Sequence, residues 1–136
     1  MLQLVYISTA RQTLTPSLLE DVLTVSRRNN ARVGVTGLLV TGGKRFLQVL
    51  EGPDQAVLTT YARIQADARH YAFVSLACRQ VAQRAFGHWD MACQHGGDAP
   101  ARGDLRDIVA SMTADLADKT LKAHFTGFAE VHARAA

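Results

Sequence analysis

Five short runs of the chain are rich in β-branched and aromatic residues, which is the composition of β-strands. These runs cover residues 2–8, 33–40, 45–50, 72–81 and 88–94. The segment Thr41-Gly42-Gly43-Lys44 joins the second run to the third, and its adjacent glycines favour a tight hairpin turn. The pattern therefore predicts a sheet in which at least two strands form a hairpin.

Two stretches between these runs carry apolar residues at a spacing of three or four, as amphipathic helices do. The first is predicted to begin at Pro16 and to end at Asn29-Asn30, and the second begins after Pro53. The apolar stripe of the second helix is predicted to comprise Val57, Tyr61 and Ile64, with Leu58 beside it. The order βαββαββ predicts an α+β fold, a ferredoxin-like mixed sheet with two helices on one face.

A segment rich in helix and strand breakers divides the chain at residues 95–100. We therefore predict a domain over residues 1–94, a linker over 95–100 and a helical extension over 101–136. One helical face of the extension carries Leu105, Ile108, Val109, Met112 and Leu116. A second stripe is formed by Leu121, Phe125 and Phe128, with a candidate break at Gly127. The extension is thus expected to hold one good helix and one poorer helix.

Composition places the chain among soluble globular proteins. It has 136 residues, of which 48% are hydrophobic and 20% are charged, and its formal net charge is +3. No apolar run reaches the length of a membrane span, and no secretory signal is recognisable, so we expect a cytoplasmic protein without membrane contact. The positive surplus is too scattered to indicate nucleic acid by itself and could equally serve a phosphorylated small ligand.

The motifs of common catalytic sites are missing from the sequence. There is no GxSxG, P-loop, GxGxxG or HExxH, and the five histidines have no metal-ligand spacing with the two cysteines. We therefore expect neither an enzyme nor a metal site.

Several polar residues stand where a purely structural role is the commonest explanation. A strand tyrosine such as Tyr6 usually belongs to the core, and a strand glutamine such as Gln48 usually faces solvent. Asn30 would ordinarily be a helix C-cap, and Ser26 an inert helix residue. Core or helix-surface roles would account for the others: Arg63, Asp67, Arg69, His70, Trp89 and Met91.

Taken together, however, the fragments that contain these residues resemble the BLUF family, sensors of blue light using FAD. The fragments are LVYIS around Tyr6, SRRNN at 26–30, GVTGLLV at 34–40, FLQVLEGP at 46–53, YARIQADARH at 61–70 and Trp89-Asp90-Met91. The combination of FLQVLEG with SRRNN is highly specific, and the match covers about residues 2–94. The chain looks like the short, stand-alone type of BLUF protein, which acts by contact with another protein.

The resemblance implies a role for each polar residue. Tyr6 matches the tyrosine that donates an electron and a proton to the excited flavin, and Gln48 matches the glutamine that bridges this tyrosine and the flavin ring. After recombination Gln48 is left rotated or tautomerised, and the absorption is reversibly shifted to the red. Trp89 and Met91 match the strand that passes on the signal. The implied cofactor contacts are Ser26, Asn29, Asn30, Gln48, Arg63, Asp67, Arg69 and His70.

The resemblance implies FAD as cofactor, although the sequence does not separate FAD from FMN. The apolar stripe of the extension needs a partner, which is either its own sheet or another subunit. We therefore expect a homo-oligomer, a dimer or larger, together with an unidentified downstream protein. One departure from the family is Asp90, where serine is common, and another is Gly87-His88, near which a proline is common; both concern the last strand.

Two other classes of function are open to a chain of this pattern. A ferredoxin-like RNA-binding module is suggested by the fold and the positive charge, but it would need exposed aromatic residues on the central strands, where Phe46 is the sole aromatic. A small acyl- or phosphoryl-hydrolase could use Asn30 and Arg28, but no nucleophile–base pair supports it.

Overall fold

The computed structural model describes residues 1–11, 16–42, 44–86, 92–95, 105–114 and 116–132. The elements in chain order are β1 (Leu2–Ala10), α1 (Pro16–Val33), β2 (Thr36–Gly42), β3 (Arg45–Gly52), α2 (Asp54–Gln65), β4 (His70–Gln80), β5 (Ala92–His95), α3 (Leu105–Met112) and α4 (Lys119–His132). The predicted order βαββαββ and the α+β class are confirmed. β5 extends to His95, the first residue of the predicted linker, and residues 96–100 lie outside the described residues.

The strands form a single mixed sheet in the order β4-β1-β3-β2-β5. Neighbouring strands are antiparallel except for β2 and β5, which run parallel. β1 and β3 therefore lie side by side in the interior of the sheet, and their register places Tyr6 directly opposite Gln48. The ferredoxin-like topology thus brings together two residues that are 42 positions apart in the sequence.

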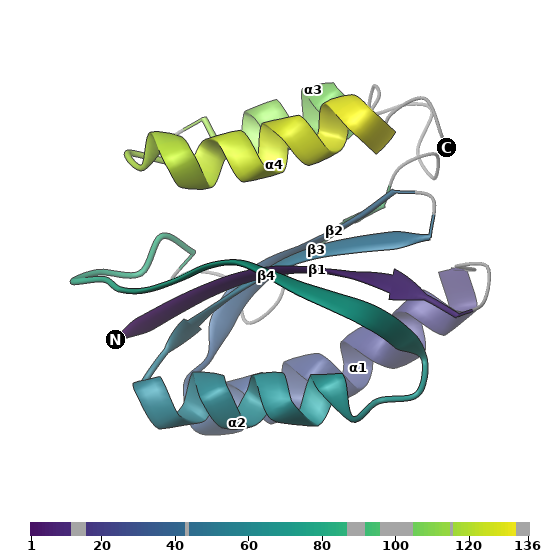
Figure 1. Cartoon of the computed structure of the whole chain (residues 1–136), viewed down its shortest axis with the longest axis vertical. Helices are drawn as coiled ribbons and strands as arrows, with labels where there is room; N and C mark the ends of the chain where they lie inside the picture. The colour runs from purple at the N-terminus through teal and green to yellow at the C-terminus, as the bar shows by residue number, and fades with distance from the viewer. Residues whose placement is uncertain (12–15, 43, 87–91, 96–104, 115, 133–136) are drawn as a thin grey trace.

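Helices cover both faces of this sheet (Figure 1). α1 and α2 lie on one face, as predicted, and α3 and α4 lie on the other. Because side chains alternate along a strand, the strands contribute to two separate cores. Leu4, Tyr6 and Leu50 belong to the core beneath α1 and α2, whereas Val5 and Val49 belong to the core beneath α3 and α4. The C-terminal extension therefore packs on the sheet of its own domain.

α4 corrects the expectation for the end of the chain. It runs unbroken through Gly127 and has 14 residues, against eight in α3. Its residues Leu121, Phe125 and Phe128 are buried in the core that they share with the sheet. A lone glycine inside a helix costs only about 1 kcal/mol relative to alanine, so the burial of its apolar neighbours outweighs it. The expected break and the expected poorer helix were wrong, and Leu116 lies beyond the end of α3.

The end of α1 also differs from the prediction. The helix continues past Asn30 to Val33 and stops at Gly34, which has a left-handed φ of 75°. The N–H of Val35 donates to the carbonyl oxygen of Asn30 at 2.9 Å, so this is a Schellman motif with glycine at the left-handed position. The cap is therefore made by Gly34 and not by the side chain of Asn30.

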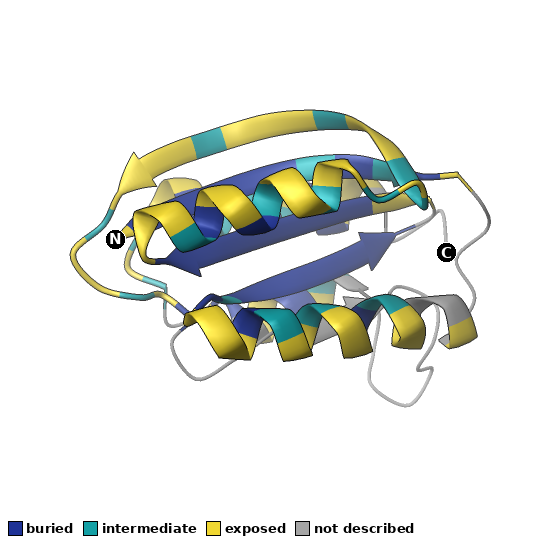
Figure 2. Cartoon of the chain, turned by 90° about the horizontal axis from the view of Figure 1, so that it is seen from below, coloured by how far each residue is buried: buried dark blue, intermediate teal, exposed yellow. Residues whose placement is uncertain are grey.

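Two further details of the fold differ from the apolar pattern. Leu58, expected beside the buried stripe of α2, is 47% exposed, whereas Val57 is fully buried. β4 forms one edge of the sheet, and its side chains are exposed or half-buried along its whole length (Figure 2).

In the described part of the chain, no helix has the length and apolar character needed to cross a bilayer.

Candidate functional site

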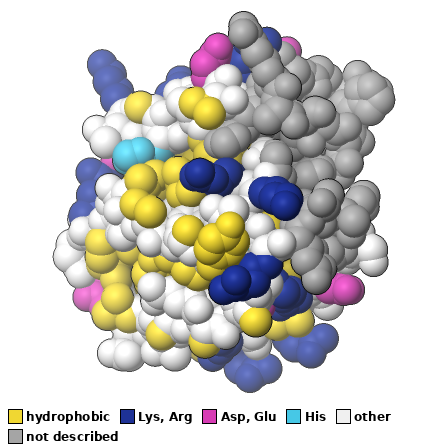
Figure 3. Space-filling view, turned by 45° about the vertical axis from the view of Figure 1, so that its right-hand side comes forward, with side chains coloured by type: hydrophobic (Ala, Val, Ile, Leu, Met, Phe, Trp, Pro, Cys, Tyr) yellow, Lys and Arg dark blue, Asp and Glu magenta, His cyan; other side chains and the backbone are white. Residues whose placement is uncertain are grey.

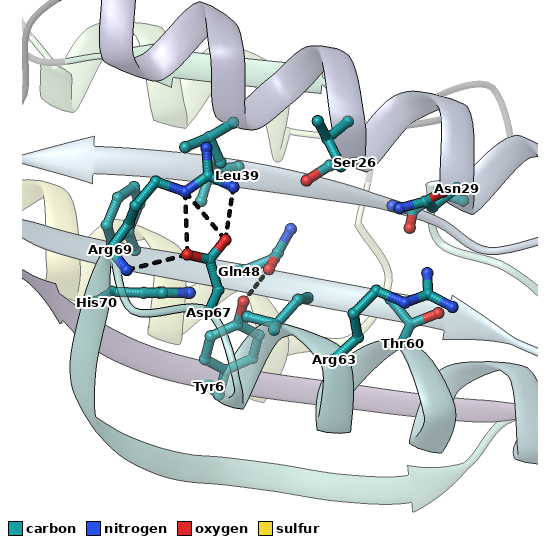
Figure 4. Close-up of a pocket in the computed structure, with 15 residues that line it drawn as sticks. Tyr6, Ser26, Asn29, Leu39, Gln48, Thr60, Arg63, Asp67, Arg69 and His70 are labelled. Atoms are coloured by element: carbon teal, nitrogen blue, oxygen red, sulfur yellow. Dashed lines mark hydrogen bonds and ion pairs between the residues drawn. The ribbon is translucent and has the colours of Figure 1, made fainter.

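A cavity lies between α1, α2 and the sheet face that carries Tyr6 and Gln48 (Figure 4). The space between these elements, including the open solvent at its mouth, is about 690 Å³. The lining residues are Tyr6, Val22, Val25, Ser26, Asn29, Asn30, Leu39, Phe46, Gln48, Thr60, Arg63, Ile64, Asp67, Arg69 and His70. The cavity thus brings together every expected photoactive or cofactor-binding residue. Trp89 and Met91, expected to carry the signal, lie outside the described residues.

The floor of the cavity is a hydrogen-bonded pair from two adjacent strands. The Tyr6 hydroxyl donates a hydrogen bond to Oε1 of Gln48, and the two side chains are only 1% and 4% exposed. Figure 4 shows the amide nitrogen of Gln48 on the side away from Tyr6, directed toward α1. Gln48 therefore accepts from Tyr6 with one end of its amide and presents the donor end to the cavity.

An aromatic environment surrounds Tyr6. The ring of Tyr61 lies 4.9 Å from that of Tyr6 between centroids, and the ring of Phe73 lies at 5.7 Å. Burial raises the pKa of Tyr6 well above its ordinary value, and the neighbouring Tyr61 adds to the shift. The Tyr6 phenol consequently keeps its proton at physiological pH and remains a donor to Gln48.

α1 supplies polar groups to the opposite wall. Asn29 and Asn30 lie three and four positions after Ser26, so each is a neighbour of Ser26 on one face of the helix. Asn30 is buried and Asn29 is half-buried. Since Gly34 ends the helix, the two amides need not serve as caps, and they line the cavity instead.

The end of α2 and the start of β4 form a charged rim. Arg69 Nη2 donates to Asp67 Oδ2 at 2.6 Å, and Arg69 Nε donates to both carboxylate oxygens at 3.0 Å. These hydrogen bonds lower the pKa of Asp67 and raise the pKa of Arg69, so each neutralises much of the other's charge. Arg63, in contrast, forms no ion pair with any residue that the structure describes, so it is better suited to hold an anion at this rim.

His70 joins the rim to the floor. Its Nδ1 atom lies 2.9 Å from Ser8 Oγ, and its ring lies 4.6 Å from the ring of Phe73 between centroids. Burial lowers the pKa of His70, which keeps the imidazole neutral near pH 7. This serine–histidine contact was not foreseen from the sequence, but Ser8 is fully buried and does not line the cavity, so it cannot attack a bound substrate.

These donors suit a flat heteroaromatic ring. Neutral amides from α1 and β3 face a slot with apolar walls, and a flavin ring has hydrogen-bonding edges and apolar faces. The described residues contain no group of three or more His, Cys, Asp or Glu that could hold a metal ion. The apolar lining residues were not predicted to belong to the site: Val22, Val25, Leu39, Phe46 and Ile64. The apolar periodicity of the helices could have indicated those on α1 and α2, because the cavity wall continues the apolar helix faces that pack on the sheet.

Comparison with known families shows to which family the chain belongs. A family model described as "Sensors of blue-light using FAD" matches residues 1–92. The chain belongs to the BLUF family. The resemblance found in the sequence is thereby confirmed, and the family description names FAD as the cofactor.

Individual BLUF relatives agree with this assignment. The chain is 37% identical over 84 residues to the blue light- and temperature-regulated antirepressor BluF of Escherichia coli (strain K12), a match that covers 62% of this chain and 21% of that protein. The chain spans about a fifth or less of the length of the curated relatives it matches.

Solved BLUF structures share the fold. The dark-state structure of BlrB, a BLUF protein, has a TM-score of 0.73 and 26% identity, and the match covers 95% of this chain and 96% of that chain. BlrP1 of Klebsiella pneumoniae with FMN and cyclic diGMP has a TM-score of 0.72 and 27% identity, over 92% of this chain and 34% of that chain. Both alignments extend beyond the 92 residues of the family match.

Proposed function

We propose that this chain is a blue-light photoreceptor that holds FAD in the cavity between α1 and α2 and passes on its signal by protein contact, without catalytic turnover. The observation that carries the proposal is the buried Tyr6–Gln48 pair at the floor of the cavity, in which the amide nitrogen of Gln48 is directed toward α1. FMN is the second candidate cofactor, in view of its presence in the BlrP1 structure.

The cofactor contacts follow from the donors around the cavity. The amides of Asn29, Asn30 and Gln48 would hold the polar edge of the ring system, with Ser26 beside them. Arg63 would hold a phosphate at the mouth, and Asp67 would orient Arg69 there through its hydrogen bonds. His70, neutral through burial, would contribute a ring edge and one hydrogen bond.

Tyr6 and Gln48 would carry the light response. When bound and excited by blue light, the flavin supplies an acceptor for one electron and one proton. Tyr6 is the donor, because its protected phenol retains a proton and already shares it with Gln48. The Gln48 amide can exchange its acceptor and donor ends by rotation or tautomerisation. When the proton returns to Tyr6, the hydroxyl therefore faces a Gln48 side chain in the rearranged form. No covalent bond is permanently made, so the return in the dark is spontaneous, and the rearranged hydrogen bond is worth about 0.5–1.5 kcal/mol net.

The structure gives reasons against the two rival functions. An RNA-binding module of this topology needs an open sheet face, but helices cover both faces here and Phe46 is buried. A hydrolase needs an accessible nucleophile, and the one serine next to a histidine among the described contacts, Ser8, is fully buried.

Partners and location are also part of the proposal. Exposed apolar side chains on the open edge strand β4, namely Tyr71, Val74 and Leu76, favour contact with a second copy of the chain or with a downstream protein. Figure 3 shows an apolar area on one face of the molecule, with Lys and Arg side chains beside it. We propose a cytoplasmic protein, in keeping with a free thiol at exposed Cys78. The photosensor domain would be residues 1–94, with output through Trp89, Met91 and the extension at 101–136.

Flavin content is the first test of this function. Protein expressed with ample riboflavin and then denatured should release about one flavin per chain, most of it FAD, since the proposed cofactor contacts all line the same cavity. Release of no flavin would contradict the proposal, and release of mostly FMN would correct the cofactor.

A further inference from the structure

The side chain of Glu51 is fully buried on the sheet face opposite the cavity. Its carboxylate accepts hydrogen bonds from Gln3 Nε2 at 3.1 Å, from the Ala85 N–H at 3.0 Å and from the Phe86 N–H. A buried carboxylate is strongly destabilising unless such donors satisfy it. Glu51 therefore holds together β3, β1 and the segment that follows β4.

Arg84 links the same segment to the sheet through further hydrogen bonds. Its Nη1 atom donates to the carbonyl oxygen of Glu51 at 3.0 Å and to Thr36 Oγ1 at 2.9 Å. Its Nη2 atom donates to the carbonyl oxygen of Gly34 at 2.7 Å. Residues 84–86 are thus tied to the ends of β2 and β3 by both side-chain and backbone groups.

Phe86 connects this anchored segment to α4. Its side chain is 2% exposed, and its ring lies 5.9 Å from the ring of Phe125 between centroids, at an interplanar angle of 62°. Both rings belong to the core beneath α3 and α4, together with Val49 of β3. The position of α4 is therefore sensitive to the backbone that Glu51 holds.

Gln48 and Glu51 lie three residues apart on β3, so their side chains point to opposite faces of the sheet. Gln48 is paired with Tyr6 on the cavity side, and Glu51 is paired with Gln3 on the α4 side. A single strand thus carries the proposed light-sensitive amide on one face and the anchor of the α4 contact on the other.

We propose that Glu51 is a positioning residue for signal output. Through its hydrogen bonds, a displacement of β3 at Gln48 also displaces Phe86 and α4. This inference rests on the proposed photoreceptor function. It requires only a small difference in contact energy between two arrangements of packed elements, because an output equilibrium near balance responds to about 1 kcal/mol.

Hydrogen exchange of the flavin-loaded protein, in the dark and under blue light, tests this role. Glu51→Gln has nearly the same shape but turns an amide NH₂ toward backbone N–H donors. It should leave the flavin content and the red shift unchanged, and it should reduce the light-minus-dark difference in exchange over residues 119–132 about threefold or more. Phe86→Leu keeps the backbone donors of Glu51 but removes the ring contact with Phe125, so it should have the same effect.

Val57→Ala is the matched control. Val57 is fully buried against the other sheet face and does not line the cavity, so its truncation weakens the core without touching the anchor. The light-minus-dark difference in hydrogen exchange over residues 119–132 should persist in Val57→Ala. The inference is overturned if Glu51→Gln and Phe86→Leu both keep the full difference, if Val57→Ala loses as much, or if the wild type shows a red shift with no change over 119–132. Absence of any red shift in the wild type would instead refute the proposed function.

Discussion

The hydroxyl of Tyr6 donates to Oε1 of Gln48 across two paired strands, at the floor of a cavity that both residues line. The contact depends on the antiparallel register of β1 and β3, because a shift by one residue would turn one of the two side chains to the other face of the sheet. Gln48 is thereby held with its donor end toward the cavity, and Tyr6 is held as a protonated phenol.

Tyr6→Phe should bind flavin normally but lose the light-induced red shift, because phenylalanine has no transferable proton and no hydrogen bond to Gln48. The measurement is the absorption difference between illuminated and dark protein. Tyr61→Phe is the control, since Tyr61 is the neighbouring phenol and is not hydrogen-bonded to Gln48 among the described contacts. A normal red shift in Tyr6→Phe would refute the role given to Tyr6.

Gln48→Leu should also retain flavin and lose the red shift, since leucine fills a similar volume but has no donor and acceptor to exchange. Removal of the acceptor leaves the buried Tyr6 hydroxyl without its partner, so the unfolding free energy should fall by about 1–3 kcal/mol. Spectra and denaturant titrations measure the two effects. Gln48→Leu with an unaltered red shift would mean that the amide takes no part in the response.

The Asn30→Ala variant is expected to weaken flavin retention. Loss of a buried amide contact of about 1–3 kcal/mol corresponds to a dissociation constant raised by about five-fold to 150-fold. Thr24→Ala serves as the control, because Thr24 lies on the exposed side of the same helix and does not line the cavity. An unchanged dissociation constant in Asn30→Ala, measured by flavin titration of the apoprotein, would assign Asn30 a structural role only.

The sequence was sufficient to predict the elements and the grouping of the site. The grouping of Tyr6 with Gln48 came from the resemblance to the BLUF family, because the strand pattern alone favoured a solvent-facing Gln48; the two residues share a face through the register of β1 and β3. The end of α1 was misplaced because Asn30 resembles a cap, whereas the cap is set by Gly34 and the Val35 N–H. Gly127 was taken for a break because helix propensity ignores the burial of Phe125 and Phe128.

Specific side-chain pairings were beyond the sequence pattern, both within a turn and between distant segments. The pairing of Asp67 with Arg69 depends on the turn between α2 and β4, and it removes much of the charge that Arg69 was expected to offer to a phosphate. The anchoring of Ala85 and Phe86 by Glu51 joins positions 34 and 35 residues apart, which no local periodicity indicates.

Acidification should destabilise the protein through His70. Burial lowers the pKa of this imidazole in the folded state, so below about pH 6.5 the unfolded chain binds the additional proton more readily. The contribution of neutral His70 to the free energy of unfolding is complete above the pKa of His70 in the unfolded chain. It is lost as the pH falls toward the lower pKa of His70 in the folded state. Asp67 and Arg69 are the charged groups beside His70, and Asp67 stays ionised throughout this window because its pKa is lowered. Denaturant titrations between pH 8 and pH 5 should therefore show a steeper decline for the wild type than for His70→Asn; equal slopes would contradict this assignment.

The most direct test of the central claim is the absorption spectrum of the purified wild-type protein before and after blue light. The Tyr6–Gln48 arrangement predicts that the flavin band moves to longer wavelength under illumination and returns by itself in the dark, with no net loss of flavin absorbance. A flavin-loaded protein whose band does not move, or whose absorbance bleaches without recovery, would contradict the account.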